Sequence, residues 1–288
     1  MTLKHIVIPA AGIGTRMLPA TRVIAKEMLP VYNKPVIQYV VEEAVSANIT
    51  DAVFVTSLGK ESIVDHFDNT SPRIPVENLP EHLRLETLAA EGIIKCTAVR
   101  QKKPEGLGHA VLTGASVIPG KPYGVMLPDV IIHSPKGKSC MQRMVDLYNE
   151  TSASVVALME VPDKDRERYG MVKGKNHGEG IIEITSMSEK PGIDGTDSNL
   201  AIVGRYVFSP LLTEILPHTT PGRNNEIQLT DAIKTLSEKE PVYGIVAGKN
   251  EKIFDTGTPE GYVLASAFMA AEKHSDFMSK LNKELESK

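Results

Sequence analysis

Cysteine is scarce in this 288-residue sequence: the two that occur, Cys96 and Cys140, have neither a metal-binding spacing nor the numbers of a disulfide framework. We expect both to be small buried apolar side chains of a protein from a reducing compartment. Apolar runs are also short, and none approaches the roughly 20 residues that cross a bilayer. A basic leader with a small-residue cleavage site is missing. These absences predict a cytoplasmic protein that does not enter a membrane.

Net positive charge is absent too. The formal charge is −4 at pH 7, which gives no general attraction to a nucleic acid polymer or to an anionic membrane surface. Hydrophobic residues make up 41% and charged residues 24%, an ordinary balance for a soluble enzyme. Because no repeat, low-complexity tract or convincing linker interrupts the chain, we expect one domain over residues 1–288.

Segments with strand and helix patterns alternate through the first half of the chain. Such alternation favours an α/β fold with a mostly parallel sheet and helices on both faces. Ligands of such sheets bind beyond the carboxyl ends of the strands. Strands are expected at 6–10, 51–56 and 124–129 and just before Arg100, and helices at 35–46 and 61–67 and after Gly106.

Strand patterns dominate from about residue 152 onward, and helices return near the end. The polar, proline-punctuated stretch 68–91 is expected to be a mobile, lid-like insertion. Strands are expected at 154–160, 171–173, 181–188 and 200–208, and helices at 210–215, 228–237 and from 260 to the C-terminus.

A glycine-rich turn follows the first expected strand. Gly12 and Gly14 let a ligand approach the main chain, where successive N–H groups can hold an anion. Arg16 and Lys26 follow closely, and two cations beside such a turn suit a triphosphate. The turn completes neither the dinucleotide fingerprint nor a P-loop, so an ordinary turn with a solvated Lys26 is the open alternative.

Six blocks of sequence resemble, in the same order, those of the bacterial UTP–glucose-1-phosphate uridylyltransferases. The resemblance runs from about Ile6 to Tyr262. It implies a Rossmann-like nucleotidyltransferase fold with a mixed sheet flanked by helices, and Mg²⁺-dependent formation of UDP-glucose and pyrophosphate from UTP and glucose 1-phosphate. It also implies a homo-oligomer, dimeric or tetrameric. The blocks are the loop region (10–21, 26–30 and 34–39), 100–101 with 106–110, 127–130, 188–191, 198–206 and 225–232.

This family organisation would place the nucleotide in about residues 1–135 and the sugar phosphate in about residues 150–262, with a C-terminal helix after 260. On the nucleotide side, uracil needs a few directed hydrogen bonds. Gln101 is the amide candidate, with the backbone of Ala10, Ala11, Gly12 and Gly14 and the turn at Gly108 around the base and ribose.

Two carboxylates are candidates for the metal. Phosphoryl-type transfer depends on position and charge neutralisation, and Mg²⁺ binds a few carboxylates together with phosphate oxygens and water. Asp129 and Asp255 each follow apolar residues beside a turn, and the resemblance implies the same pair. The alternative is that each aspartate only caps a turn or helix.

The sugar side is expected around Glu189, a candidate acceptor for sugar hydroxyls, and Lys190, a partner for the sugar phosphate. Adjacent strand residues point to opposite faces, so the chain must turn between them if both reach one ligand, and Pro191 favours such a turn. By resemblance the backbones at Gly170 and Gly204 approach the sugar. With Arg16 and Lys26, Lys190 completes the predicted catalytic set.

Two features bear on specificity. The block Gly-Leu-Gly-His-Ala at 106–110 replaces the Gly-Leu-Ala-Gln-Ala that is usual in thymidylyltransferase relatives, and His109 in it is interpreted as structural rather than catalytic. Residues 22–25 lack the proline that commonly precedes the Lys26 block, and 32–35 lean toward the thymidylyl relatives. The alternatives are therefore a thymidylyl or other sugar-1-phosphate nucleotidyltransferase, or a catalytically weak regulatory paralogue. Retention of every charged candidate residue argues against the paralogue.

Overall fold

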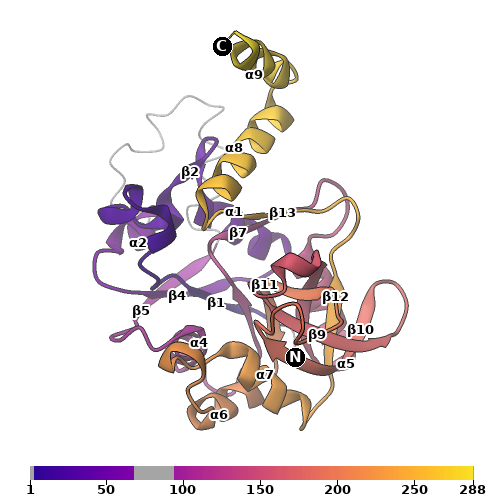
Figure 1. Cartoon of the computed structure of the whole chain (residues 1–288). Helices are drawn as coiled ribbons and strands as arrows, with labels where there is room; N and C mark the ends of the chain where they lie inside the picture. Colours follow the sequence, from indigo (N-terminus) through magenta and orange to yellow (C-terminus); the bar gives the residue numbers. More distant parts are fainter. Residues whose placement is uncertain (1–2, 68–93, 288) are drawn as a thin grey trace.

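A nine-stranded mixed sheet forms the centre of the molecule (Figure 1), in the order β5-β4-β1-β6-β11-β8-β12-β10-β9. The structure is a computed structural model that describes residues 3–67 and 94–287, so the insertion expected at 68–91 lies outside the described residues. The strands are β1 His5–Pro9, β4 Asp51–Thr56, β5 Lys95–Arg100, β6 Tyr123–Met126, β8 Ser154–Glu160, β9 Gly170–Asn176, β10 Ile181–Glu189, β11 Leu200–Phe208 and β12 Val242–Val246.

The two halves of this sheet differ in strand direction. Strands β5, β4, β1 and β6 are all parallel. Beyond them β11 runs antiparallel to β6 and β8, β12 is parallel to β8, and β10 is antiparallel to β12 and β9. The α/β prediction is confirmed, but the mostly parallel arrangement holds only for the first half. Later strands such as β9 and β10 are joined by a connection too short for the crossover that parallel strands need.

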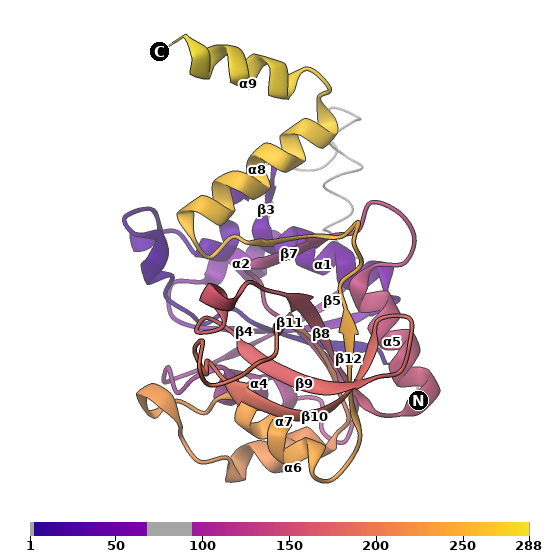
Figure 2. The same cartoon turned by 45° about the vertical axis from the view of Figure 1, so that its right-hand side comes forward.

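Helices cover both faces of the sheet because successive strand residues point to opposite sides. Ile6 and Ile8 pack with α1 and α5, whereas Val7 between them packs with α4, α6 and α7. Figures 1 and 2 both place α4, α6 and α7 together below the sheet. The helices are α1 Val36–Ser46, α2 Glu61–Phe67, α4 Leu107–Ala115, α5 Cys140–Thr151, α6 Leu211–Ile215, α7 Leu229–Ser237, α8 Pro259–Lys273 and α9 Phe277–Glu286.

The end of the chain forms two helices where one was expected, because the extended residue His274 ends α8. Helix α8 packs through Ala265 and Met269 on a small cluster that includes Phe254, whereas α9 buries none of its residues and projects away from the body (Figure 2). Among the described residues, no helix is both long and apolar enough to cross a membrane.

A short antiparallel pair beside the main sheet joins distant parts of the chain. Strand β7 (Val130–His133) pairs with β13 (Lys252–Asp255), which sets Asp255 opposite Val130. A second small pair, β2 (Pro30–Val31) with β3 (Lys34–Pro35), follows the glycine-rich region. That region also forms the 3-10 turns Thr15–Met17, Ala20–Arg22 and Lys26–Met28, and further 3-10 turns lie at Asp163–Asp165, Leu216–His218 and Arg223–Asn225.

Candidate active site

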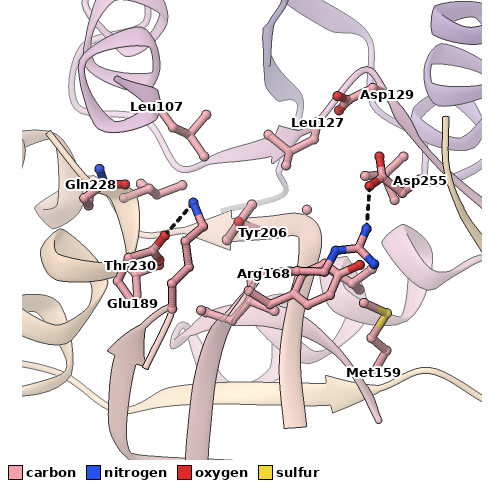
Figure 3. A pocket seen from close by; sticks show the side chains of 18 of the residues that line it. Leu107, Leu127, Asp129, Met159, Arg168, Glu189, Tyr206, Gln228, Thr230 and Asp255 are labelled. Atoms are coloured by element: carbon pink, nitrogen blue, oxygen red, sulfur yellow. Dashed lines mark hydrogen bonds and ion pairs between the residues drawn. The ribbon is translucent and has the colours of Figure 1, made fainter. Parts of the chain in front are cut away.

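A cavity of about 620 Å³ lies where the β6–β7 turn, the strands β9, β10 and β11 and the start of α7 meet (Figure 3). It collects residues that lie far apart in the sequence. Of the predicted site residues, those in its wall are Arg16, Asp129, Gly170, Glu189, Lys190, Gly204 and Asp255; those outside its wall are Ala10, Ala11, Gly12, Gly14, Lys26, Gln101 and Gly108.

Asp129 sits in the turn between β6 and β7 and not at the end of one long strand as expected. Its Oδ2 is 2.6 Å from Nζ of Lys26 and 3.9 Å from the guanidinium of Arg16. Burial disfavours the Asp129 carboxylate, but the charge and hydrogen bond of Lys26 together with the charge of Arg16 outweigh burial, so the pKa of Asp129 lies below its ordinary value. Burial likewise opposes the Lys26 ammonium, but Asp129 and Glu27 together raise the pKa of Lys26 above its ordinary value. Both side chains are therefore charged near neutral pH.

Asp255 reaches the same place through the pairing of β13 with β7. Thr256, the next residue, donates from both its N–H and its hydroxyl to the carbonyl oxygen of Asp129, each at 2.8 Å. The Asp255 carboxylate lies 3.4 Å from Arg16 and 3.3 Å from Arg168, and Figure 3 shows Arg168 directed toward it. The pairing of β13 with β7 thus brings together two carboxylates that are separated by more than a hundred residues.

The chemistry of this pair fits a divalent cation. Asp129 and Asp255 both contact the guanidinium of Arg16, so their oxygens converge on a position that a positive group already occupies. Among the described residues there is no group of three or more carboxylate, histidine or cysteine side chains that could hold a metal alone. Two carboxylates suit Mg²⁺, which takes its remaining ligands from phosphate and water.

On the opposite wall, Glu189 and Lys190 share one side of the chain. Lys190 has φ 44°, in the left-handed region, so the turn that both side chains require occurs at Lys190 itself. Its Nζ lies 3.2 Å from Oε1 of Glu189, and Thr230 donates at 2.6 Å to the other oxygen of that carboxylate (Figure 3). The carboxylate is therefore held from two directions while facing the cavity.

Two glycines of the cavity wall have structural reasons to be glycine. A Cβ on Gly170 would lie 2.8 Å from the Thr230 hydroxyl, and one on Gly204, which has φ +75°, would lie 3.0 Å from Leu127. Side chains there would disturb Thr230 and the β6–β7 turn and would fill part of the cavity.

A buried ion pair between Lys60 and Glu27 contacts the backbone of the glycine-rich turn. Lys60 donates at 2.6 Å to the carbonyl oxygen of Gly12 and at 2.7 Å to Oε2 of Glu27, whose side chain is 0% exposed. Burial raises the pKa of Glu27 and lowers that of Lys60. Gly14 takes φ 70°. The pair ties the turn to α2 and to the segment that carries Lys26.

Two of the predicted base-binding residues, Gln101 and Gly108, lie where β5 ends and α4 begins. Gln101 donates through Nε2 to the carbonyl oxygen of Gly106 at 3.2 Å and shares a 2.9 Å hydrogen bond with Nδ1 of His109. Gly108 donates its own N–H to Ile227 at 2.8 Å, and a Cβ there would clash with that residue. Gly108 thus packs the start of α4 onto the chain near α7.

A second buried pair lies behind the carboxylates. Arg205 of β11 is 0% exposed and donates twice to Oε2 of Glu43, at 2.8 and 3.0 Å. The same guanidinium donates at 3.2 Å to the carbonyl oxygen of Leu127 and at 2.8 Å to that of Val130. These two carbonyls bracket Asp129, so Arg205 fixes the backbone that carries the carboxylate.

Sequence reasoning missed several of these residues. Arg168 contacts Asp255, Thr230 holds Glu189, and Lys60 and Arg205 support the loop and the turn. Thr230 and Arg205 lie inside blocks that carried the family resemblance, and Arg168 lies two residues before Gly170. Their positions in or near predicted site segments were the signal from which they could have been found. Nothing in the sequence around Lys60 distinguishes it from a solvated lysine.

Comparison with known proteins agrees with this geometry. The nucleotidyl transferase family matches residues 5–272, nearly the whole chain. A UTP–glucose-1-phosphate uridylyltransferase of Pseudomonas aeruginosa is 40% identical over 269 residues, which cover 92% of this chain and 95% of that protein. The chain belongs to this nucleotidyltransferase family. Its reaction class is accordingly the transfer of a nucleotidyl group.

Further relatives agree with the assignment. A Staphylococcus epidermidis protein with the same name is 40% identical and is matched over 91% of this chain and 90% of its own. A crystal structure of UDP-glucose pyrophosphorylase complexed with UDP-glucose superposes with a TM-score of 0.86 at 39% identity, covering 94% of this chain and all of that one. The nucleotidyltransferase fold is thereby confirmed, whereas the roles of individual site residues stay predictions.

Proposed function

We propose that this enzyme transfers a uridylyl group from UTP to glucose 1-phosphate and releases pyrophosphate. One observation carries the proposal: a single cavity has the carboxylates Asp129 and Asp255 with Arg16 on one wall, and Glu189 with Lys190 on the other. A triphosphate that carries a divalent cation suits the first wall, and a sugar phosphate suits the second. The relatives that match nearly the whole chain bear the name of this reaction.

In the proposed reaction an oxygen of the glucose 1-phosphate attacks the α-phosphorus of UTP. The bond between that phosphorus and the α,β-bridging oxygen breaks, and pyrophosphate leaves with the bond's electron pair. The sugar phosphate is already ionised, so no general base is required. The protein must hold two anions in line and neutralise their repulsion.

On the sugar side, Glu189 accepts hydrogen bonds from glucose hydroxyls. Thr230 and Lys190 keep its oxygens in place, at 2.6 and 3.2 Å. The Lys190 ammonium, next to this carboxylate, binds the phosphate of the sugar. Because Gly170 and Gly204 have no side chains, the cavity keeps room for the glucose ring.

On the nucleotide side, Arg16 and Lys26 neutralise the charge that grows on the leaving pyrophosphate. Asp129 and Asp255 would hold Mg²⁺, which supplies further charge neutralisation when bound. Arg205, through the carbonyls on either side of Asp129, keeps that carboxylate in position. The amide of Gln101, with the backbone of the glycine-rich turn, binds uracil and ribose.

The test is pyrophosphate release by purified protein with glucose 1-phosphate, Mg²⁺ and each nucleoside triphosphate in turn. UTP should exceed dTTP by at least about tenfold, which corresponds to roughly 1.4 kcal/mol of differential transition-state binding. The Gly-Leu-Gly-His-Ala block at 106–110 motivates this preference. Equal rates with dTTP would favour a thymidylyl or mixed-specificity enzyme instead.

We also propose that the enzyme works in the cytoplasm as a homodimer or homotetramer. Neither Cys96 nor Cys140 forms a disulfide with the other, in keeping with a reducing compartment. Val263 and Leu264 of α8 and Leu285 of α9 are exposed apolar side chains, which association of copies would cover. Light scattering coupled to size-exclusion chromatography gives the number of copies, and a strictly monomeric mass would refute the oligomer.

A further inference from the structure

We propose that His109 is a specificity-determining positioning residue, which fixes the Gln101 amide so that its oxygen selects a pyrimidine that carries hydrogen on N3. The inference rests on the proposed function, in which Gln101 contacts the base. It assigns His109 and its neighbour Glu105 a role that the chemistry of phosphoryl transfer does not require.

The orientation of the Gln101 amide follows from its two partners. Its nitrogen lies 3.2 Å from the carbonyl oxygen of Gly106. A carbonyl oxygen only accepts hydrogen bonds, so the NH₂ group must face it. The same nitrogen is 2.9 Å from Nδ1 of His109, and both contacts are satisfied when Nδ1 accepts. Turning the amide over would set its oxygen against the Gly106 carbonyl.

Glu105 decides which nitrogen of His109 accepts. Nε2 of His109 lies 3.3 Å from Oε2 of Glu105, a residue that precedes the start of α4. An ionised carboxylate only accepts, so the ring proton stays on Nε2 and leaves a lone pair on Nδ1. Glu105 thereby fixes the tautomer of His109, and that tautomer fixes the orientation of the Gln101 amide. The carbonyl oxygen of Gly106 is a second acceptor for the same NH₂ group.

The oxygen of the amide is the remaining atom, and it faces away from both partners. Among the described residues, Oε1 of Gln101 has no hydrogen-bond partner, and it keeps some exposure to solvent. The backbone N–H of Gln101 donates to the carbonyl oxygen of Thr56 at the end of β4. This hydrogen bond places Gln101 on the carboxyl edge of the parallel strands. Ligands of such sheets bind at this edge, where the glycine-rich turn also begins.

A fixed amide oxygen distinguishes pyrimidines by one atom. Uracil and thymine carry a hydrogen on N3 that can donate to it, whereas N3 of cytosine is itself an acceptor. Two acceptors would then face each other, and a site that leaves polar groups unpaired rejects the wrong ligand. The arrangement therefore separates UTP from CTP and leaves UTP against dTTP unaffected, which supplies an internal control.

The experiment measures kcat/KM of the full-length chain for UTP, CTP and dTTP in wild type, His109→Ala and His109→Asn. His109→Ala removes the acceptor and should lower the UTP-to-CTP ratio about tenfold, the worth of one lost hydrogen bond to the amide. His109→Asn keeps an oxygen near the position of Nδ1 and should restore most of the ratio. The UTP-to-dTTP ratio should stay within about twofold in both variants.

Glu105→Ala is the variant for the case in which a His109 substitution fails to fold. The Glu105 side chain is 47% exposed, so its loss leaves the core intact. Glu105→Ala should shift the UTP-to-CTP ratio in the same direction by a smaller factor. An unchanged UTP-to-CTP ratio in His109→Ala, or an equal fall for all three nucleotides, would overturn the proposal. So would failure of His109→Asn to recover the ratio.

Equilibrium binding of UTP and CTP to the same proteins separates this inference from the proposed function. If the wild type binds UTP but releases no pyrophosphate with glucose 1-phosphate, the proposed function fails, and the ratio of binding constants still decides the role of His109. If the wild type binds CTP as tightly as UTP, the inference fails even when uridylyl transfer is observed.

Discussion

Two groups of opposite charges lie on either side of the β6–β7 turn and differ in how fully their hydrogen bonds are used. The closed pair, Glu43 with Arg205, is buried. Glu43 accepts from Arg205 and from the N–H of Met141, and Arg205 donates to Glu43 and to backbone carbonyls. The open cluster comprises Arg16, Lys26, Asp129, Arg168 and Asp255. Its contacts include distances of 3.3, 3.4 and 3.9 Å, and the Arg16 and Arg168 side chains are 56% and 44% exposed.

The difference separates the fixed part of the site from the exchangeable part. A buried pair whose hydrogen bonds are all made has none to offer a new ligand. Removing one partner of such a pair lowers the stability of the fold strongly. Within the open cluster, the partly exposed Arg16 and Arg168 can give up their long contacts to a phosphate group at little cost, whereas the contact of Lys26 with Asp129 is short, at 2.6 Å. The protein thus holds the backbone of Asp129 rigid while leaving the charged side chains around it available.

The largest expected effect comes from breaking the closed pair. Arg205→Met leaves the Glu43 carboxylate buried without its partner and should lower the free energy of unfolding by roughly 3–5 kcal/mol. Urea denaturation measures this loss. The double variant Glu43→Gln with Arg205→Met should lose less than the single variant, because no charge remains buried. Equal losses in both would show that the pair contributes through packing alone.

The open cluster should respond in the opposite manner, with lost activity and retained stability. Asp129→Asn should reduce turnover by two or more orders of magnitude, about 2.7 kcal/mol in the barrier, because a neutral amide is a poor Mg²⁺ ligand. The urea midpoint should stay near that of the wild type. Normal turnover at saturating Mg²⁺ would make Asp129 a structural residue, and a collapse in stability would erase the contrast with Arg205.

The two predicted catalytic lysines sharpen the comparison further. Lys26→Ala should strongly lower turnover, because it removes stabilisation that grows toward the transition state. Lys190→Ala should mainly raise KM for glucose 1-phosphate, by about tenfold, since its partner is charged throughout the reaction. Steady-state kinetics with each substrate varied in turn distinguishes the two. Weaker UTP binding in Lys190→Ala, with glucose 1-phosphate unaffected, would reverse the two ends of the cavity.

The last contrast affects neither stability nor turnover and concerns the reactivity of the two cysteines. Burial, with the charge of Glu43 nearby, raises the pKa of the Cys140 thiol to about 12. Only the thiolate reacts, so at pH 8 roughly one molecule in ten thousand is reactive there even before access is considered. A thiol reagent should therefore label the half-exposed Cys96 first and Cys140 after unfolding in urea. Faster labelling of Cys140 in Arg205→Met would report local opening of the closed pair.

Much of the fold could be predicted because its elements carry periodic patterns. The expected strand at 51–56 and helices at 61–67 and 35–46 agree with β4, α2 and α1 to within a residue. Helix α5, with its Ser139 cap, and the strands β12 and β13 were not predicted, since their short apolar segments follow loops without a strong signal. Cys140 is buried as expected, but Cys96 is only partly so because it lies on the outermost described strand of the main sheet.

The site residues also divide into those with a local sequence signal and those without one. Residues within recognisable blocks, such as Asp129 and Glu189, could be named from the sequence, and the structure brings them into one cavity. Contacts between blocks could not be derived. The pairing of Lys60 with Glu27 and of Arg205 with Glu43 depends on which helix packs on which strand, and no local pattern records that.

The pairing of β7 with β13 also affects when the site is complete. Asp129 leaves the ribosome more than a hundred residues before Asp255, and the strand that carries Asp255 is synthesised after every described strand of the main sheet. A chain that stops before residue 252 contains the glycine-rich turn, Glu189 and Lys190, yet has neither the second carboxylate nor the partner strand of β7. Translation must therefore pass residue 255 before both carboxylates can meet, and shorter products lack the pair of carboxylates that the proposed reaction requires.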